Sequence, residues 1–358
     1  MTILYLRNNF HYFFQINFFY KKAKSFLKMR IVFLGSGGGR IQVQKQIRKT
    51  AGFYIELDKK MLVDPGVGSY LWYVLNFQDI FKVEGLDYIL ASHAHIDHCH
   101  DIIPYIDRIS IGGKRKIKTK LLASESVIEG REFGPCVDKT YLSYLQGYEI
   151  FQDKNEYKLS ENLTLKVLKN KHTDPYTYSM RFTYKKDKKN IVITYISDTA
   201  YFDELKEFSK GSDVLIVNCL RPLNDKHSYH LTANQVYEIV KEAKPRLLIL
   251  HHQGFKFLGR EKEHLKFFIK KGFYTLLSYE GLEINLKDLS FRYLLNKPYY
   301  YSYLKELLEI EKLKIFKNNQ NKKVVESKLS DFLKELKKQF ESEDVNLKET
   351  WIDKRKLF

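Results

Sequence analysis

Histidine and aspartate residues at the ends of apolar segments most constrain the fold of this 358-residue chain. Four segments that read as buried strands each run into such a residue. The segments are "LDYILASH", "NLTLKVLKNKH", "NIVITYISDT" and "RLLILHH", with His93, His172, Asp198 and the pair His251 and His252 at their ends. Ends of neighbouring strands lie close in space at one rim of a sheet. The pattern therefore predicts one polar site at such a rim.

Helical segments alternate with these strands, so the sequence predicts an α/β fold. "SYLWYVLNF" has the pattern of a helix, and "TANQVYEIVKEAKP" predicts an amphipathic helix with Thr232 as its N-cap and Pro245 after its end. "GFYIELDKKMLVDPG" predicts a β-hairpin. We expect the last two strands, "YTLLS" and "LEINL", to pair with each other.

Composition divides the chain into three parts. Residues 1–28 are rich in Phe and Tyr and contain no acidic residue, which indicates either a mis-called start before Met29 or a membrane-surface segment. Residues 29–287 form the predicted main domain. Residues 288–358 are dense in Lys, Glu and Leu, and predict a helical extension that packs on the core or on a second subunit of a homo-oligomer. No run reaches the roughly 18 apolar residues that a membrane span needs.

The net charge indicates the kind of binding partner, and the cysteine content indicates the cellular compartment. The net charge of +18 favours an anionic partner such as RNA or a nucleotide, although a Lys-rich composition also follows from genome composition or a hot habitat. Cys99, Cys136 and Cys219 are widely spaced and form no C-x-x-C pattern. This predicts no disulfide framework and a reducing, cytoplasmic compartment.

The segment "SHAHIDHCHD", residues 92–101, contains four of the eleven histidines in the chain. Its H-x-H-x-D-H spacing lets His93 and His95 bind one ion, while Asp97 and His98 reach a second ion nearby. Asp101 is predicted to hold one imidazole by its outer N–H group.

The separate strand-end residues complete the predicted pair of metal sites. His172 is expected at the first ion, and Asp198 is expected to bridge the two. For the second ion His252 fits the spacing better, with His251 as the alternative. Imidazole and carboxylate ligands suit two divalent ions, with zinc favoured and manganese or iron as alternatives.

The complete set resembles the metallo-β-lactamase superfamily. "HAHIDH" is similar to the signature motif of this superfamily, and the later His, Asp and His elements follow in the same order. The resemblance covers residues 29 to about 287. It implies a four-layer αββα sandwich with a dinuclear metal site at the rim between the sheets.

Within the superfamily the chain looks like the phosphodiesterase-like branch, which includes tRNA 3′-processing endonucleases and cyclic phosphodiesterases. "LGSGGGR" and "SYHLTANQVYEIVKEAKPRLLILHH" carry this resemblance. His230 is similar to the extra histidine of the branch, which implies contact with the scissile phosphate or proton donation to the leaving oxygen. Metal-bound hydroxide is the implied nucleophile, and Asp97 and His230 are the expected catalytic residues. The long Gly- and Pro-rich arm of the tRNA-processing enzymes is not evident, and the basic segment 112–119 fits a surface turn as well as an RNA contact.

Two other functions stay open on the same residues. Hydrolysis of an ester, thioester or lactone needs a more apolar pocket, and the aromatic residues Tyr176, Tyr178, Tyr201 and Phe202 suit it as well as they suit base stacking. A nucleic-acid-binding protein with a vestigial site is the other alternative, which the complete ligand set disfavours. "GSGGG" matches neither a dinucleotide fingerprint nor a P-loop, so we expect it to let the backbone pass close to the metal site.

Overall fold

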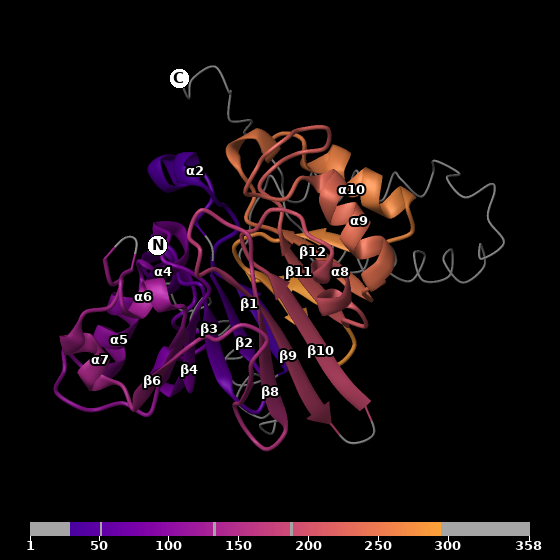
Figure 1. The fold of residues 1–358 in the computed structure, drawn as a ribbon. Coiled ribbons are helices and arrows are strands. Elements are labelled where there is room, and N and C mark those ends of the chain that lie inside the picture. The colour runs from indigo at the N-terminus through magenta and orange to yellow at the C-terminus, as the bar shows by residue number, and fades with distance from the viewer. Residues whose placement is uncertain (1–28, 51, 132–133, 187–188, 295–358) are drawn as a thin grey trace, which may run out of the picture.

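The computed structural model describes residues 29–294, except 51, 132–133 and 187–188. Within this range two mixed sheets pack face to face, and helices cover their outer faces (Figure 1). The predicted α/β sandwich is confirmed. The N-terminal segment 1–28 and residues 295–358 of the predicted helical extension lie outside the described residues.

The first sheet has the strand order β15-β14-β1-β2-β3-β4-β5-β6. Its strands are β1 (Arg30–Phe33), β2 (Phe53–Glu56), β3 (Lys60–Val63), β4 (Tyr88–Ala91), β5 (Lys120–Ala123), β6 (Gly147–Ile150), β14 (Leu282–Asn285) and β15 (Phe291–Tyr293). Strands β3 to β6 are parallel, and β2 pairs with β3 antiparallel as the predicted hairpin.

The second sheet has the order β13-β12-β11-β10-β9-β8-β7. Its strands are β7 (Glu156–Lys158), β8 (Leu163–Lys169), β9 (Tyr178–Lys186), β10 (Lys189–Ile196), β11 (Val214–Asn218), β12 (Leu247–His251) and β13 (Thr275–Leu277). The predicted pairing of the last two strands is wrong, since β13 pairs with β12 while β14 pairs with β1 in the other sheet. The short connection crosses between the sheets because Ser278 N–H donates to Leu250 and Gly281 N–H donates to Phe33.

Helices form the two outer layers of the sandwich. The first sheet is covered by α3 (Ser69–Asn76), η1 (Val83–Gly85), α4 (Ile96–Cys99), α5 (Ile102–Ser110), α6 (Glu125–Ile128) and α7 (Lys139–Tyr144). The second is covered by α8 (Glu204–Ser209), α9 (Ala233–Ala243), η2 (Phe255–Phe257) and α10 (Glu261–Lys270), whereas α2 (Arg40–Lys45) lies near the rim (Figure 1). The predicted N-cap of α9 is confirmed, because Thr232 and Gln235 form a capping box. Among the described residues no helix is both long and apolar enough to span a membrane.

Alternating strand residues fill two separate cores. Ile31 and Phe33 of β1 join the apolar cluster between the sheets, whereas Val32 joins the cluster beneath the helices of the first sheet. Central strands such as β11 and β12 therefore read as continuous apolar runs that end in a polar residue. This packing fixes the rim on which the candidate site is built.

One buried histidine belongs to the core rather than to the rim. His264 of α10 stacks on Phe257, with the ring centroids 4.0 Å apart, and its Nε2 accepts a hydrogen bond from Leu223 N–H at 3.0 Å. An acceptor nitrogen carries no proton, so the ring is held neutral. Burial lowers the pKa of His264 from its usual value of 6.5 to about 4.

We expect His264 to make stability depend on pH. As the pH falls from 6.5 to about 4, the unfolded chain protonates this histidine and the folded chain does not, so the free energy of unfolding decreases. A His264→Gln variant should be less stable than the wild type by about 1–3 kcal/mol at neutral pH, and this gap should narrow at about pH 5. Urea unfolding of both proteins measures the gap. A gap that is independent of pH would contradict the assignment.

Candidate metal centre

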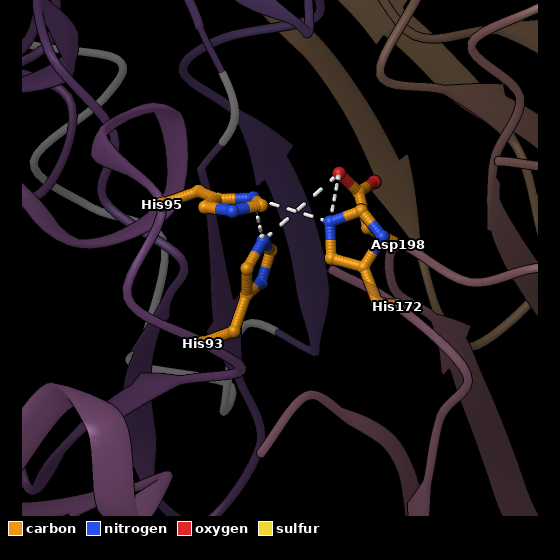
Figure 2. A group of neighbouring side chains, drawn as sticks. All are labelled: His93, His95, His172 and Asp198. Carbon is orange, nitrogen blue, oxygen red and sulfur yellow. Dashed lines mark hydrogen bonds and ion pairs between the residues drawn. The ribbon is translucent and has the colours of Figure 1, made fainter. Parts of the chain in front are cut away.

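The strand-end histidines and aspartates converge at one rim of the sandwich. Strand β4 of the first sheet leads to His93, and β8, β10 and β12 of the second sheet lead to His172, Asp198 and His252. Figure 2 shows His93, His95, His172 and Asp198 pointing toward one another from both sheets. The donor atoms fall into two groups, His93, His95, His172 and Asp198 in one and Asp97, His98 and His252 in the other, within 4.8 Å of one another in each.

The first group has the spacing of ligands around one ion. His95 Nδ1 lies 3.0 Å from His93 Nε2 and 3.1 Å from His172 Nε2. Asp198 Oδ2 lies 4.0 Å from His93 Nε2 and 3.8 Å from His172 Nε2 (Figure 2). Four tetrahedral ligands with bonds of about 2.0 Å would be about 3.3 Å apart. The observed set therefore needs only small adjustments to enclose a divalent ion.

The second group lies directly beside the first. His252 Nε2 is 2.9 Å from His98 Nε2 and 3.2 Å from Asp97 Oδ2. Asp198 also reaches this group, with Oδ2 3.5 Å from His98 Nε2 and Oδ1 3.3 Å from His252 Nδ1. Asp198 thus lies between the two groups, where a bridging carboxylate would lie.

Hydrogen bonds on the outer sides of the imidazoles set which nitrogen faces inward. His172 Nδ1–H donates to the Tyr229 carbonyl at 3.0 Å, and His98 Nδ1 lies 2.9 Å from Asp64 Oδ2. The Ser92 hydroxyl donates to Asp64, so it accepts from His93 Nδ1–H at 3.0 Å. The Nε2 lone pairs of these rings therefore point at nitrogen or oxygen atoms that carry lone pairs of their own. Only a proton or a cation between them relieves that repulsion, and this is the environment that a bound metal ion requires.

The charges at the site suit the same interpretation. Burial, together with the neighbouring imidazoles, holds the pKa of His93 well below its usual range, and burial also lowers the pKa of His172. Burial opposes a charge on Asp198, but His252, His230 and His98 hold its pKa well below the usual range. Burial likewise opposes a charge on His98, yet Asp198 raises the pKa of His98 well above normal. A raised pKa favours a proton on His98, and a bound metal ion would displace that proton.

A glycine segment brings the backbone against the second group. A Cβ atom on Gly38 would lie 2.1 Å from the His252 ring, and Gly39 N–H donates to Asp97 Oδ2 at 2.7 Å. The expectation that "GSGGG" lets the backbone approach the site is confirmed. Arg40 follows this segment as the exposed first residue of α2.

One sequence-based assignment changes, and the two histidines of the open alternative lie in different places. Asp101 accepts from Tyr70 N–H at 2.7 Å and so holds the start of α3, not an imidazole. His251 Nδ1 lies 2.8 Å from Ser278 Oγ inside the core, whereas His252, with a left-handed backbone at φ 55°, turns toward the second group. The basic segment 112–119 precedes β5, so it lies at the end of the parallel strands opposite the site.

Three supporting residues were missed by the sequence analysis. Asp64 directly follows β3 and accepts from Ser92 N–H at 2.7 Å and from the Tyr195 hydroxyl at 2.8 Å. Asn218, at the end of β11, donates from Nδ2 to Asp198 Oδ1 at 2.8 Å and lies 3.2 Å from the Tyr195 oxygen. The strand-end rule that identified His93 and Asp198 would also have identified Asp64 and Asn218.

His230 approaches the centre without joining either group. Its Nδ1 lies 3.5 Å from Asp198 Oδ2, its ring centroid is 4.8 Å from that of His172, and its side chain is 15% exposed. Burial lowers the pKa of His230 to about 3, so the ring is neutral near pH 7 and both donates and accepts hydrogen bonds. It is therefore a polar group at the open side of the centre.

Comparison with known proteins agrees with this architecture. The model of the β-lactamase superfamily domain matches residues 59–253, more than half of the chain. The uncharacterized protein MJ1374 of Methanocaldococcus jannaschii is 30% identical over 276 residues, which cover 76% of this chain and 100% of that protein. The ribonuclease Z of Thermococcus onnurineus is 32% identical over 103 residues, which cover 26% of this chain and 33% of the enzyme.

A solved structure supports the fold independently. The metallo-β-lactamase fold protein YhfI of Bacillus subtilis superposes with a TM-score of 0.58 at 23% identity, covering 71% of this chain and 98% of that one. The family match, the two-sheet sandwich and the converging His and Asp side chains lead to one conclusion. The chain belongs to the β-lactamase superfamily of metal-dependent hydrolases that have the metallo-β-lactamase fold.

Proposed function

We propose that this chain hydrolyses phosphodiester bonds, in RNA or in a nucleotide, with residues 29–287 as its catalytic domain. The position of His230 carries the proposal, because this histidine faces the bridging position of Asp198 while standing outside both ligand groups. The net charge of +18 favours an anionic substrate, and relatives named ribonuclease Z support an RNA phosphodiester.

The two groups would each hold one divalent ion, zinc in the first instance and manganese or iron as alternatives. His93, His95 and His172 would hold one ion, and Asp97, His98 and His252 the other, with Asp198 between them. When bound, such a pair of ions supplies Lewis acidity and a water molecule of lowered pKa. This chain supplies the geometry, because the rings donate hydrogen bonds to Asp64, Ser92 and the Tyr229 carbonyl, which fix them in place.

His230 would act on the substrate itself. A phosphodiester seated against the centre places an oxygen within reach of this imidazole, which lies on the open side next to Asp198 and His172. The neutral ring donates a hydrogen bond to that oxygen and so favours the departure of the leaving group. Asp97 would contribute by holding the second ion, and its carboxylate is itself fixed by the Gly39 N–H.

The first experiment combines elemental analysis with substrate comparison. We expect about two divalent ions per chain and turnover of bis(p-nitrophenyl) phosphate that EDTA abolishes. The p-nitrophenyl ester and a lactone are the comparison substrates. Turnover of these alone would replace the proposal with carbonyl ester hydrolysis on the same centre, and a protein with neither metal nor turnover would indicate a vestigial site.

Replacing His230 should separate catalysis from metal binding. We expect His230→Ala to lower kcat/KM for the diester by about 10²–10⁴-fold while the metal content stays unchanged, because His230 belongs to neither ligand group. His100→Ala is the matched control, since His100 is an exposed histidine at the end of α4. Equal activity of the two variants would remove His230 from the mechanism.

Tyr195 should affect metal affinity without binding metal. Its hydroxyl links Asp64, which orients His98, to Asn218, which orients Asp198. We expect Tyr195→Phe to weaken metal binding by about 10–100-fold in competition with a chromophoric chelator. Tyr73→Phe, another fully buried tyrosine with hydrogen bonds to Phe81 and Val83, is the control and should leave affinity unchanged. Equal metal affinities of Tyr195→Phe and Tyr73→Phe would mean that the Tyr195 hydroxyl does not position the metal-binding side chains.

A further inference from the structure

We infer that Cys99 and Cys136 form a reversible disulfide beside the candidate metal centre, and that its formation weakens metal binding at that centre. The two residues are 37 positions apart in sequence, yet their Sγ atoms lie 2.7 Å from each other. Both are free thiols in the structure. A disulfide bond of about 2.05 Å requires the sulfur atoms to approach by only about 0.7 Å, so the fold already brings the pair together.

The two thiols differ in their access to solvent. Cys99, the last residue of α4, is fully buried, whereas Cys136 is only partly buried. Cys136 is held in place by its N–H group, which donates to the Val127 carbonyl at 2.9 Å. A small oxidant therefore meets Cys136 first, and Cys99 is the buried partner that completes the bond.

The chemistry balances with a low-molecular-weight disulfide such as glutathione disulfide as oxidant. The Cys136 sulfur attacks one glutathione sulfur, which forms a mixed disulfide and releases one glutathione. The Cys99 sulfur then attacks Cys136 Sγ and expels the second glutathione. Two electrons pass from the cysteine pair to the oxidant, and the two thiol protons end on the released glutathione molecules. In a reducing compartment the bond is transient, which agrees with the absence of a disulfide framework.

The pair is connected to the ligands through a single carbonyl group. The Sγ atoms of Cys99 and Cys136 lie 3.4 Å and 3.7 Å from the oxygen of Ala94, the residue between His93 and His95. Bond formation removes both S–H groups, so this oxygen loses its thiol donors. Formation of the disulfide also moves Cys99 at the end of α4 toward Cys136. Asp97 and His98 directly precede Cys99 in this helix, so they move with it. The weakening of metal binding rests on the proposed function of this site. Formation of the disulfide does not depend on that function.

Counting free thiols tests the disulfide directly. The full-length, metal-loaded protein is treated with glutathione disulfide, denatured, and alkylated with N-ethylmaleimide. We expect the reduced protein to take up label on all three cysteines and the oxidised protein on Cys219 alone, with a cross-linked Cys99–Cys136 peptide that dithiothreitol reverses. Cys219 is an internal control, since it is buried and its sulfur lies 3.5 Å from the Arg221 carbonyl oxygen. Glutathione retained on Cys136 with Cys99 still alkylated would overturn the inference.

Release of metal tests the connection to the centre. We expect oxidised wild-type protein to lose its bound metal to a chromophoric chelator at least about tenfold faster than reduced protein. Cys136→Ser should cancel this difference and keep the basal activity, since Cys136 lies outside both ligand groups. If that variant folds poorly, Cys136→Ala serves in its place. Equal release rates of oxidised and reduced wild type would overturn the regulatory step, even where the cross-linked peptide forms.

Discussion

The mutual repulsion of inward-facing lone pairs is the interaction on which the rest of this structure depends. His93, His98 and His172 each direct a nitrogen at another donor atom within about 3–4 Å, and the Asp198 carboxylate lies among them. The rings stay this close together only if each of them is held in position by a hydrogen bond on its outer nitrogen. Hydrogen bonds to Ser92, Asp64 and the Tyr229 carbonyl provide that support, so the outer bonds and the inner ligand set form one unit.

The sandwich provides the rigidity that this unit needs. Strand β4 of the first sheet and strands β8, β10 and β12 of the second end at the same rim, and the core between the sheets prevents one sheet from sliding against the other. Tyr195 crosses the interface, since it lies on β10 of the second sheet and donates to Asp64 of the first. Asp64 itself has a left-handed backbone, at φ 46°, and four side-chain hydrogen bonds with Ser92, His98 and Tyr195 offset that strain.

Most of the candidate site could be predicted from the sequence because its residues obey one simple rule. Apolar strands are recognisable locally, and a His or Asp placed immediately after one of them has few structural reasons to be there. The rule failed where the decisive information was not local. The partner of Asp101 depended on where α3 begins, and the choice between His251 and His252 depended on one left-handed residue. Strands β13 and β14 looked like a pair because their separation in different sheets is set by neighbours far away in sequence.

The distribution of ligands over both sheets has a consequence for biogenesis. His93 and His95 come from the first sheet, while His172 and Asp198 come from the second, so neither half of the chain contains a complete ion site. A ribosome-bound chain that has exposed only β1 to β6 holds the H-x-H-x-D-H segment but lacks His172, Asp198 and His252. With the proposed metal-binding role, loading of metal would therefore follow closure of the sandwich, because each ligand group draws on both sheets.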